Sequence, residues 1–564
     1  MLDIPELDTM VYQCLSERDF ARCALVCKKW HALVMPHLWR DLAWLKKSPK
    51  NLYAFVRILH NGYRDAIRRQ ELLDKGDRTM GQPTPPQSSS SSSSSSVTAS
   101  SPPPSSVLSK YARWIRVLPD TSSLKDPCLL GFEPLLHLFK LCSPSVQVDR
   151  SSISTWDLDR APYDTHRQMV EFAIPRARCL GFHVHLLNFH AQLSRTVNLF
   201  NQCSGTLQRL ELSVDIPLHQ PDFKEEEEEE PTDNDPKPWT LSLKELALCH
   251  WTDVIGINPF HTWFFKQCSQ VVRLEIHNTH GHAKLLAQAM LTHMPLLTEI
   301  ALGCDTYRSG RLSQAAVSTL LSGSRQGWKR IEFGTEAGFG PLAIAALNKH
   351  LTTLETLISD ACIQFEDYQR VRVLRTAQKL CSFKDIRDYG CGAIQGVDFI
   401  DQDERTGDLR PWECEATLKQ LKIKLSRLTV MDADGFMVGV SMTHGRQAQF
   451  RLHDRLARFT RLEVLWIKGD PCGGKFKRGK YTKKTWLSNG LPQLAGLKAL
   501  KELGIESMFA KIGVEEMEWM TKNWPELRTI RGLGRDVGEL KATKWLQEHH
   551  PLIDVSLDSR YGLK

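Results

Sequence analysis

Features that would place a chain in the membrane or on the secretory route are missing from this sequence. No stretch of the 564 residues approaches the roughly 18 consecutive apolar residues that are needed to cross a bilayer. The first ten residues also lack the basic start and apolar run of a secretory signal peptide. We therefore expect an intracellular protein of the cytoplasm, the nucleus or both, with no membrane partner.

Charge and cysteine usage are also unremarkable. A net charge of +8 is small for a chain of this length, so nucleic acid is not an expected partner. The fifteen cysteines are scattered and odd in number, which favours reduced thiols over a disulfide framework. The group nearest to a metal site is Cys23, Cys27, His31 and His37, but its helical spacing, without a second Cys-x-x-Cys pair, favours helix packing. No metal or other cofactor is expected.

Catalytic motifs are missing too. The sequence contains no G-x-S-x-G elbow, no H-E-x-x-H and no dinucleotide fingerprint. The stretch "GDPCGGKF" (469–476) has the glycines and the lysine of a phosphate-binding loop. However, Phe476 stands where a Ser or Thr would help to hold magnesium. Catalytic residues can converge in space without a motif, so nucleotide hydrolysis at Lys475 ranks third among the hypotheses, behind two that involve no catalysis.

Two segments have little apolar content with which to offset chain entropy. Residues 74–109 contain "PTPPQSSSSSSSSSVTASSPPPSS", and residues 224–238 read "KEEEEEEPTDNDPKP". We expect both to be disordered, the first as a flexible Ser/Pro-rich segment and the second as an acidic loop.

A repeated apolar pattern occupies the chain beyond the Ser/Pro-rich segment. The unit is one apolar residue, two further residues, an apolar residue, one residue and a last apolar residue, as in "LQRLEL" and "LKELAL". Eleven copies start at residues 207, 243, 271, 297, 328, 354, 383, 418, 462, 500 and 527, and earlier candidates start at 112, 143 and 177. The end of each unit predicts a short strand, and amphipathic stretches such as 514–526 predict helical returns. Stacked units bury what one unit cannot, which predicts a curved α/β solenoid. Because the spacing is irregular, an α/β domain of unrelated strands and helices remains an alternative.

The first 45 residues follow a different pattern. "IPELDTMVYQCL" places Ile4, Leu7, Val11 and Leu15 on one helical face, and two more short helices are predicted in "SERDFARCALVCKKW" and "HALVMPHLWRDL". Three such helices are too small for an independent core, so we expect them to pack against a partner.

These residues closely resemble the F-box, through the Ile-Pro start, the Asp-Phe step, "VCKKW" and the closing Leu-Trp of "IPEL…RDFARCALVCKKWHALVMPHLW". The resemblance implies docking onto the Skp adaptor of an SCF-type cullin-RING ubiquitin ligase. Together with the repeat pattern and the segments of low apolar content, it predicts an α/β chain in this order: F-box 3–45, linking helix 46–73, disordered segment 74–109 and leucine-rich-repeat-like horseshoe 110–564. Carried over by position, the adaptor-binding residues are Ile4, Pro5, Leu7, Val26, Cys27, Trp30, Leu33, Leu38 and Trp39.

Target contacts are expected where strand residues alternate with the buried ones, on the concave face of the solenoid. On the later strands these candidates are Lys422, Lys424, Trp466 and Lys468, with Glu506 and Arg531 at further concave positions. The lysines suggest an acidic or phosphorylated target, and a merely solvated basic face is the alternative. Trp466 is either an interface anchor or a side chain packed under a loop. A basic loop then contributes Lys475, Lys477 and Arg478.

The combined hypothesis is a non-catalytic subunit that recruits a target protein to an SCF ligase for ubiquitination. The main alternative is a leucine-rich-repeat scaffold that serves a complex without ligase activity.

Overall fold

The structure is a computed structural model that describes part of the chain. The described residues are 57, 61, 64, 67–68, 71–72, 112, 115–118, 137–138, 140–142, 147–154, 174–185, 200, 202, 205–215, 242–249, 264–277, 283–303, 312–334, 337–359, 365–385, 394–403, 405–425, 442–469, 486–487, 490–506, 512–533 and 537–557. The expected F-box, the Ser/Pro-rich segment and the acidic loop lie outside them. The described positions between 57 and 72, within the expected linking helix, are helical.

The chain divides into two units, and the boundary between Leu246 and Ala247 falls inside strand β5. In the first unit, β1 to β4 pair in parallel with their neighbours in chain order. Their bounds, with those of β5 and the short 3-10 helix η3, are β1 (Val117–Leu118), β2 (Gln147–Ser154), η3 (Ile174–Arg176), β3 (Ala177–His185), β4 (Arg209–Asp215) and β5 (Glu245–Cys249).

The second unit carries a longer parallel sheet, in which consecutive strands from β6 to β15 are hydrogen-bonded. The strands are β6 (Arg273–His277), β7 (Glu299–Leu302), β8 (Arg330–Phe333), β9 (Thr356–Ile358), β10 (Ser382–Asp385), β11 (Gln420–Leu425), β12 (Val464–Gly469), β13 (Glu502–Glu506), β14 (Thr529–Leu533) and β15 (Asp554–Leu557). A parallel sheet in strict chain order requires one return crossing per strand, as a repeat solenoid does.

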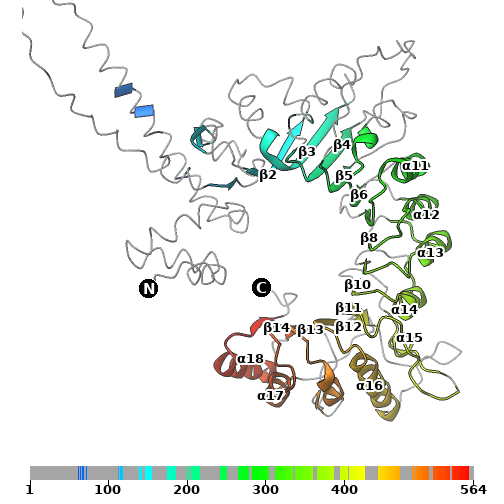
Figure 1. Cartoon of the computed structure of the whole chain (residues 1–564). Coiled ribbons are helices and arrows are strands. Elements are labelled where there is room, and N and C mark those ends of the chain that lie inside the picture. The colour runs from blue at the N-terminus through cyan, green and yellow to red at the C-terminus, as the bar shows by residue number, and fades with distance from the viewer. Residues whose placement is uncertain are drawn as a thin grey trace, which may run out of the picture. The chain divides into compact units, whose positions relative to one another are not determined.

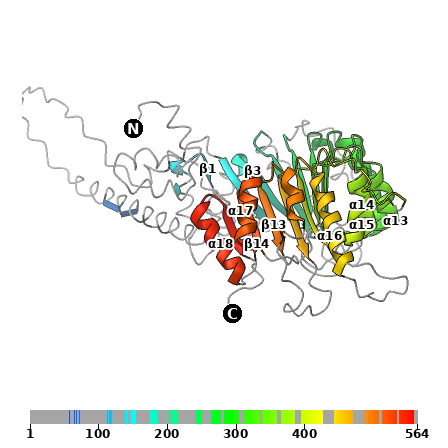
Figure 2. The ribbon, with the colours of Figure 1, turned by 90° about the horizontal axis from the view of Figure 1, so that it is seen from below.

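Helices form most of the described returns in the second unit. They are α11 (Ala283–His293), α12 (Gln314–Leu321), α13 (Pro341–Asn348), α14 (Asp367–Thr376), α15 (Gly396–Ile400), α16 (Met442–Ala457), the 3-10 helix η6 (Leu491–Gly496), α17 (Val514–Asn523) and α18 (Val537–His549). Figure 1 shows the strands of this unit along the inner side of an arc and the helices along its outer side. In Figure 2 the later strands lie side by side, with α16, α17 and α18 running alongside them. The second unit is therefore a leucine-rich-repeat-like α/β solenoid, as predicted.

The core follows the repeated apolar pattern. In "LQRLEL", Leu207, Leu210 and Leu212 are fully buried, and the equivalent residues of "LKQLKI", Leu418, Leu421 and Ile423, are buried as well. A hydroxyl before the first apolar position ties adjacent repeats together. Thr417, for example, donates to the backbone carbonyl of Leu380 at 2.9 Å, and Ser242 and Thr353 make the same bond to the preceding repeat.

One predicted copy is displaced by three residues. The unit expected to start at Phe383 in fact starts at Leu380, and Leu380, Phe383 and Asp385 take the three inward positions. The prediction was wrong because Asp385, which is fully buried, stands where most other repeats have an apolar side chain; the preceding repeat has Ser359 there, which is also fully buried. Its carboxylate forms an ion pair with the Nε of Arg370 on α14 at 3.1 Å, and Ser359 donates to it at 3.0 Å. A search for apolar residues cannot find a position that is buried through charge pairing.

The remaining predicted copies coincide with strands, and the candidates at 112, 143 and 177 coincide with β1, β2 and β3. The strand β15 was not predicted. Its repeat, "LIDVSL", fits the pattern, but Leu552 at its first position is 94% exposed.

Candidate protein-binding site

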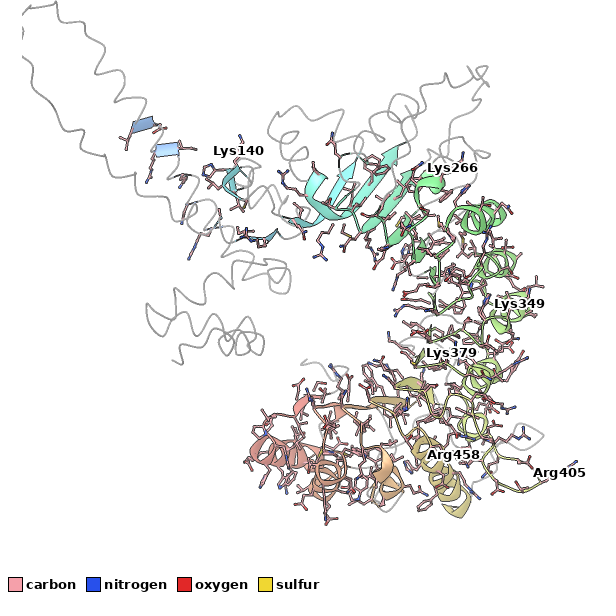
Figure 3. All side chains as sticks on the ribbon, viewed as in Figure 1. Lys140, Lys266, Lys349, Lys379, Arg405 and Arg458 are labelled. Carbon is pink, nitrogen blue, oxygen red and sulfur yellow. The ribbon has the colours of Figure 1, made fainter. Side chains whose placement is uncertain are left out.

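Four strands of the second unit place a row of side chains on the concave face of the sheet. In the parallel register, Lys422 on β11 is opposite Trp466 on β12, Trp466 is opposite Gly504 on β13, and Gly504 is opposite Arg531 on β14. Each of these residues alternates with buried leucines or isoleucines of its own strand, which assigns the row to the face away from the helices. Figure 3 shows the described side chains on the ribbon, in the same view as Figure 1.

The Trp466 ring lies over the backbone of Gly504. A Cβ atom added to Gly504 would lie 1.9 Å from Cδ1 of Trp466, so any larger residue at this position would displace the ring. On the other side, the ammonium of Lys422 lies 4.8 Å from the ring centroid, a cation–π contact. Neighbours on both adjacent strands therefore determine the position of the ring.

A carboxylate from the neighbouring row completes this arrangement. Glu502 on β13 forms ion pairs with Lys422 at 3.7 Å and with Arg531 at 3.2 Å. The side chains of Lys422 and Glu502 are 19% and 23% exposed, whereas that of Arg531 is 42% exposed. We call Lys422, Trp466, Glu502, Gly504 and Arg531 the Trp466 patch. It has two cations and one carboxylate, and Arg531 is the cation most accessible to a partner.

Two of the predicted target contacts are not accessible. Lys424 and Lys468 are opposite each other on β11 and β12 but are only 3% and 5% exposed, and both have further interactions. The structure therefore corrects the expectation that these two lysines present their charge on the surface. Lys475, Lys477 and Arg478 lie outside the described residues, as do all nine predicted adaptor-binding residues.

The concave positions of β6, β7 and β8 have a different charge arrangement. Arg273 lies within 4 Å of three carboxylates: Glu275 at 2.8 Å, Glu332 at 3.5 Å and Glu299 at 3.7 Å. Arg330 also pairs with Glu332 at 3.4 Å. Two arginines thus face three glutamates, so these positions carry one net negative charge whereas the Trp466 patch carries one net positive charge.

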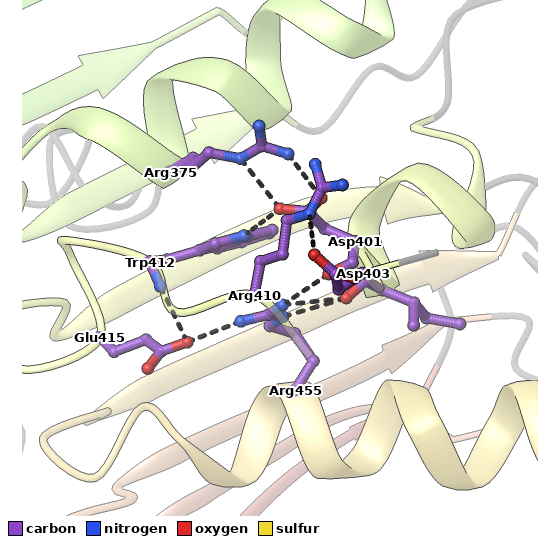
Figure 4. Close-up of polar contacts among 8 residues, drawn as sticks. Arg375, Asp401, Asp403, Arg410, Trp412, Glu415 and Arg455 are labelled. Carbon is purple, nitrogen blue, oxygen red and sulfur yellow. Dashed lines mark hydrogen bonds and ion pairs between the residues drawn. The ribbon is translucent and has the colours of Figure 1, made fainter. Parts of the chain in front are cut away.

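A second polar cluster lies in the connection between β10 and β11 (Figure 4). Asp401 ends α15 with a left-handed φ of 49°, a conformation that Asp tolerates better than most residues. Its carboxylate accepts hydrogen bonds from both the guanidinium of Arg375 and, at 2.9 Å, the indole Nε1 of Trp412.

Arg455 on α16 connects this cluster to the next repeat. Its fully buried side chain donates to the carbonyl of Ile400 at 2.9 Å and to Glu415 at 2.6 Å, and it stacks on Trp412 at 4.4 Å. Burial lowers the pKa of Arg455 from its ordinary value, and the Glu415 carboxylate acts in the opposite direction. Its polar contacts are made to the chain itself, so we interpret this cluster as an anchor between repeats and not as a binding site.

Sequence reasoning missed Glu502 and Gly504. Glu502 lies two residues before Gly504 on β13 and therefore one concave position before the row of Lys422, Trp466 and Arg531. Gly504 has no side chain that would suggest a contact. Alignment of "LEVLWI" with "LKELGI" would have revealed Gly504, because it places this glycine directly opposite Trp466.

Within the described residues, no three His, Cys, Asp or Glu side chains are grouped so as to hold a metal ion. In the same part of the chain, no helix is long and apolar enough to cross a membrane.

Comparison with known proteins identifies the N-terminal region. Residues 5–43 match the F-box-like family model, which confirms the F-box expected there. The chain thus combines an F-box-like domain with a leucine-rich-repeat-like solenoid, and the domain supports an adaptor role. No curated protein matches the chain. Among solved structures, a chain of "Crystal structure of Rad7 and Elc1 complex in yeast" is similar at 11% identity, with a TM-score of 0.36, over 76% of this chain and 78% of that chain. A similarity this distant carries no inference about function.

Proposed function

We propose that this protein is the substrate-recruiting subunit of an SCF-type ubiquitin ligase. The observation that carries the proposal is the match of residues 5–43 to the F-box-like family. F-box domains are typically non-catalytic adaptors, and the proposal assigns no bond chemistry to this chain. The F-box binds the Skp adaptor, which in turn connects it to the cullin-RING ligase.

The proposed adaptor contacts are those that the F-box resemblance implies. They are Ile4, Pro5, Leu7, Val26, Cys27, Trp30, Leu33, Leu38 and Trp39. All but Ile4 fall within the matched residues. Proline and isoleucine at the start of the segment are less useful to a core of three short helices, so we expect Pro5 and Ile4 to contribute mainly to the interface.

The solenoid is proposed to hold the target protein on its concave face. Holding a target near the ubiquitin-charged enzyme raises the effective concentration of its lysines to the order of millimolar. Parallel strands in chain order produce such a continuous concave surface, and repeat proteins use it for extended binding. The basic loop predicted after β12, with Lys475, Lys477 and Arg478, is proposed to add positive charge to the target-binding surface. Neutralising this loop should weaken target capture and leave adaptor binding intact.

Adaptor binding tests the proposal directly. The full-length chain is co-expressed with the Skp adaptor and purified through a tag on this chain. We expect the adaptor to co-purify in equal amounts, and the paired change Pro5→Ala and Trp30→Ala to remove it. Leu540→Ala, on the exposed face of α18, is the matched control and should retain the adaptor.

The alternative is a repeat scaffold for a complex without ligase activity. It predicts that the wild-type chain, folded by circular dichroism, does not bind the Skp adaptor. It also predicts that Pro5→Ala with Trp30→Ala changes nothing in the proteins that co-purify. Either result would reject the ligase assignment.

A further inference from the structure

The two charged regions of the solenoid favour different partners. On β6 to β8, Arg273 and Arg330 are already paired with Glu275, Glu299 and Glu332, and His277 lies 3.7 Å from Glu275, so the three carboxylates outnumber the two arginines. An acidic partner would be repelled there. In the Trp466 patch, Lys422 and Arg531 share the single carboxylate of Glu502, so an incoming carboxylate can pair with a cation without displacing an existing pair.

The arrangement that holds the Trp466 ring in place lowers the stability of the fold. Among the residues that the structure describes, the buried Nε1 of this ring has no hydrogen-bond partner, and an unsatisfied buried donor destabilises a fold. Gly504 leaves space for the ring but contributes no side chain to the sheet. An unsatisfied donor and a glycine within a strand both depart from what favours stability, and such departures are expected at binding sites. A rigid aromatic side chain also loses little conformational entropy when a partner docks.

The row of concave side chains from Lys422 to Arg531 is also about as long as a short extended peptide. Neighbouring strands are about 4.8 Å apart, so Lys422 and Arg531, three strands apart, span about 14 Å, which corresponds to about four extended residues. A segment lying across the strands would contact Lys422, Trp466 and Arg531 in turn. The carboxylate of Glu502 between the two cations disfavours a continuous nucleic-acid phosphate backbone.

We propose that the Trp466 patch binds a short segment of the target protein that is rich in Asp and Glu. The proposal rests on the function proposed above and specifies which part of the concave face selects the target. Arg531, the most exposed cation, forms an ion pair with an acidic side chain, and the Trp466 ring packs against the adjoining residue of the segment.

The test uses the full-length chain with a displayed library of random peptides, from which enriched sequences are read. We expect enrichment of peptides rich in Asp and Glu. A labelled, enriched peptide is then titrated with the protein by fluorescence anisotropy at low and at high salt, and high salt should weaken the binding. Trp466→Ala and Arg531→Ala should each lower the affinity about tenfold or more.

Gly504→Ala provides a test that leaves charge unchanged. Its added methyl group displaces the Trp466 ring and should lower the affinity about as much as Trp466→Ala does. In the double variant with Trp466→Ala there is no ring to displace, so the second substitution should add no further loss. Arg273→Ala and Lys329→Ala are matched cation controls on the same unit and should change the affinity less than about twofold.

Several results would overturn the proposal. They are the absence of enriched peptides, enrichment of neutral or basic peptides, equal losses in the patch and control variants, and tighter binding of a single-stranded oligonucleotide at the same residues. Adaptor co-purification is measured on the same preparations. Loss of adaptor binding alone therefore rejects the ligase assignment, and loss of peptide selectivity alone rejects the role of the Trp466 patch.

Discussion

The buried ion pair between Arg370 and Asp385 yields the most quantitative prediction. Both side chains are at most 1% exposed, and Asp385 occupies a core position that is leucine or isoleucine in many repeats. At 3.1 Å and an effective dielectric constant of about 20, their Coulomb attraction is about 5 kcal/mol. Asp385→Leu restores the apolar pattern but leaves the Arg370 guanidinium buried without this partner. We expect it to reduce the free energy of unfolding by about 3–5 kcal/mol.

A compensating variant separates pairing from packing. Arg370→Met with Asp385→Leu and Ser359→Ala replaces the whole polar group, including the hydroxyl that donates to Asp385. Apolar replacement of a buried ion pair is often neutral or stabilising, so we expect a free energy of unfolding within about 2 kcal/mol of wild type.

The assay is thermal unfolding of the full-length chain, followed by near-ultraviolet circular dichroism. At about 2 °C per kcal/mol, the single variant should unfold about 6–10 °C below wild type. Hydrogen exchange of the peptides that cover β10 should show where the loss is located. Glu355→Ala, which breaks the exposed pair with Lys329, is the control and should cost less than about 1 kcal/mol. The reasoning is refuted if Asp385→Leu is as stable as wild type, or if the triple variant is as unstable as Asp385→Leu.

Three further predictions concern stability. Arg455→Ala should cost about 3–5 kcal/mol in chemical unfolding because it leaves Glu415 and the Ile400 carbonyl without their buried donor; a loss below about 1 kcal/mol would contradict the anchor role. Burial lowers the pKa of His350 from 6.5, so the unfolded chain binds this proton more readily and stability falls as the pH drops below about 6.5. His350→Gln should flatten the melting temperature between about pH 7.5 and pH 5.5, and an unchanged slope would exclude this group. Ser313→Ala removes the cap bond to the Ala316 amide and should cost about 1 kcal/mol by thermal unfolding; no change would mean that the cap is dispensable.

The repeat architecture could be predicted from local pattern because a strand buried on one face requires alternating apolar residues. Leu418, Leu421 and Ile423 satisfy this requirement within six residues of chain. The register at β10 could not be predicted, since Asp385 is buried only because Arg370, fifteen positions earlier, reaches it through the return helix. The last repeat was missed although Leu552 fits the pattern.

The same division applies to the binding site. The sequence by itself determined the F-box-like segment, the solenoid and the concave positions of Lys422, Trp466 and Arg531, because spacing along one strand decides which side chains share a face. Only the tertiary structure decided that Lys424 and Lys468 are buried and that Glu502 lies between two cations. It also decided that Gly504 makes room for the Trp466 ring. These features depend on the pairing register of strands whose opposite residues lie 27 to 44 positions apart in the chain, and that register is determined by packing between repeats and not by any local stretch.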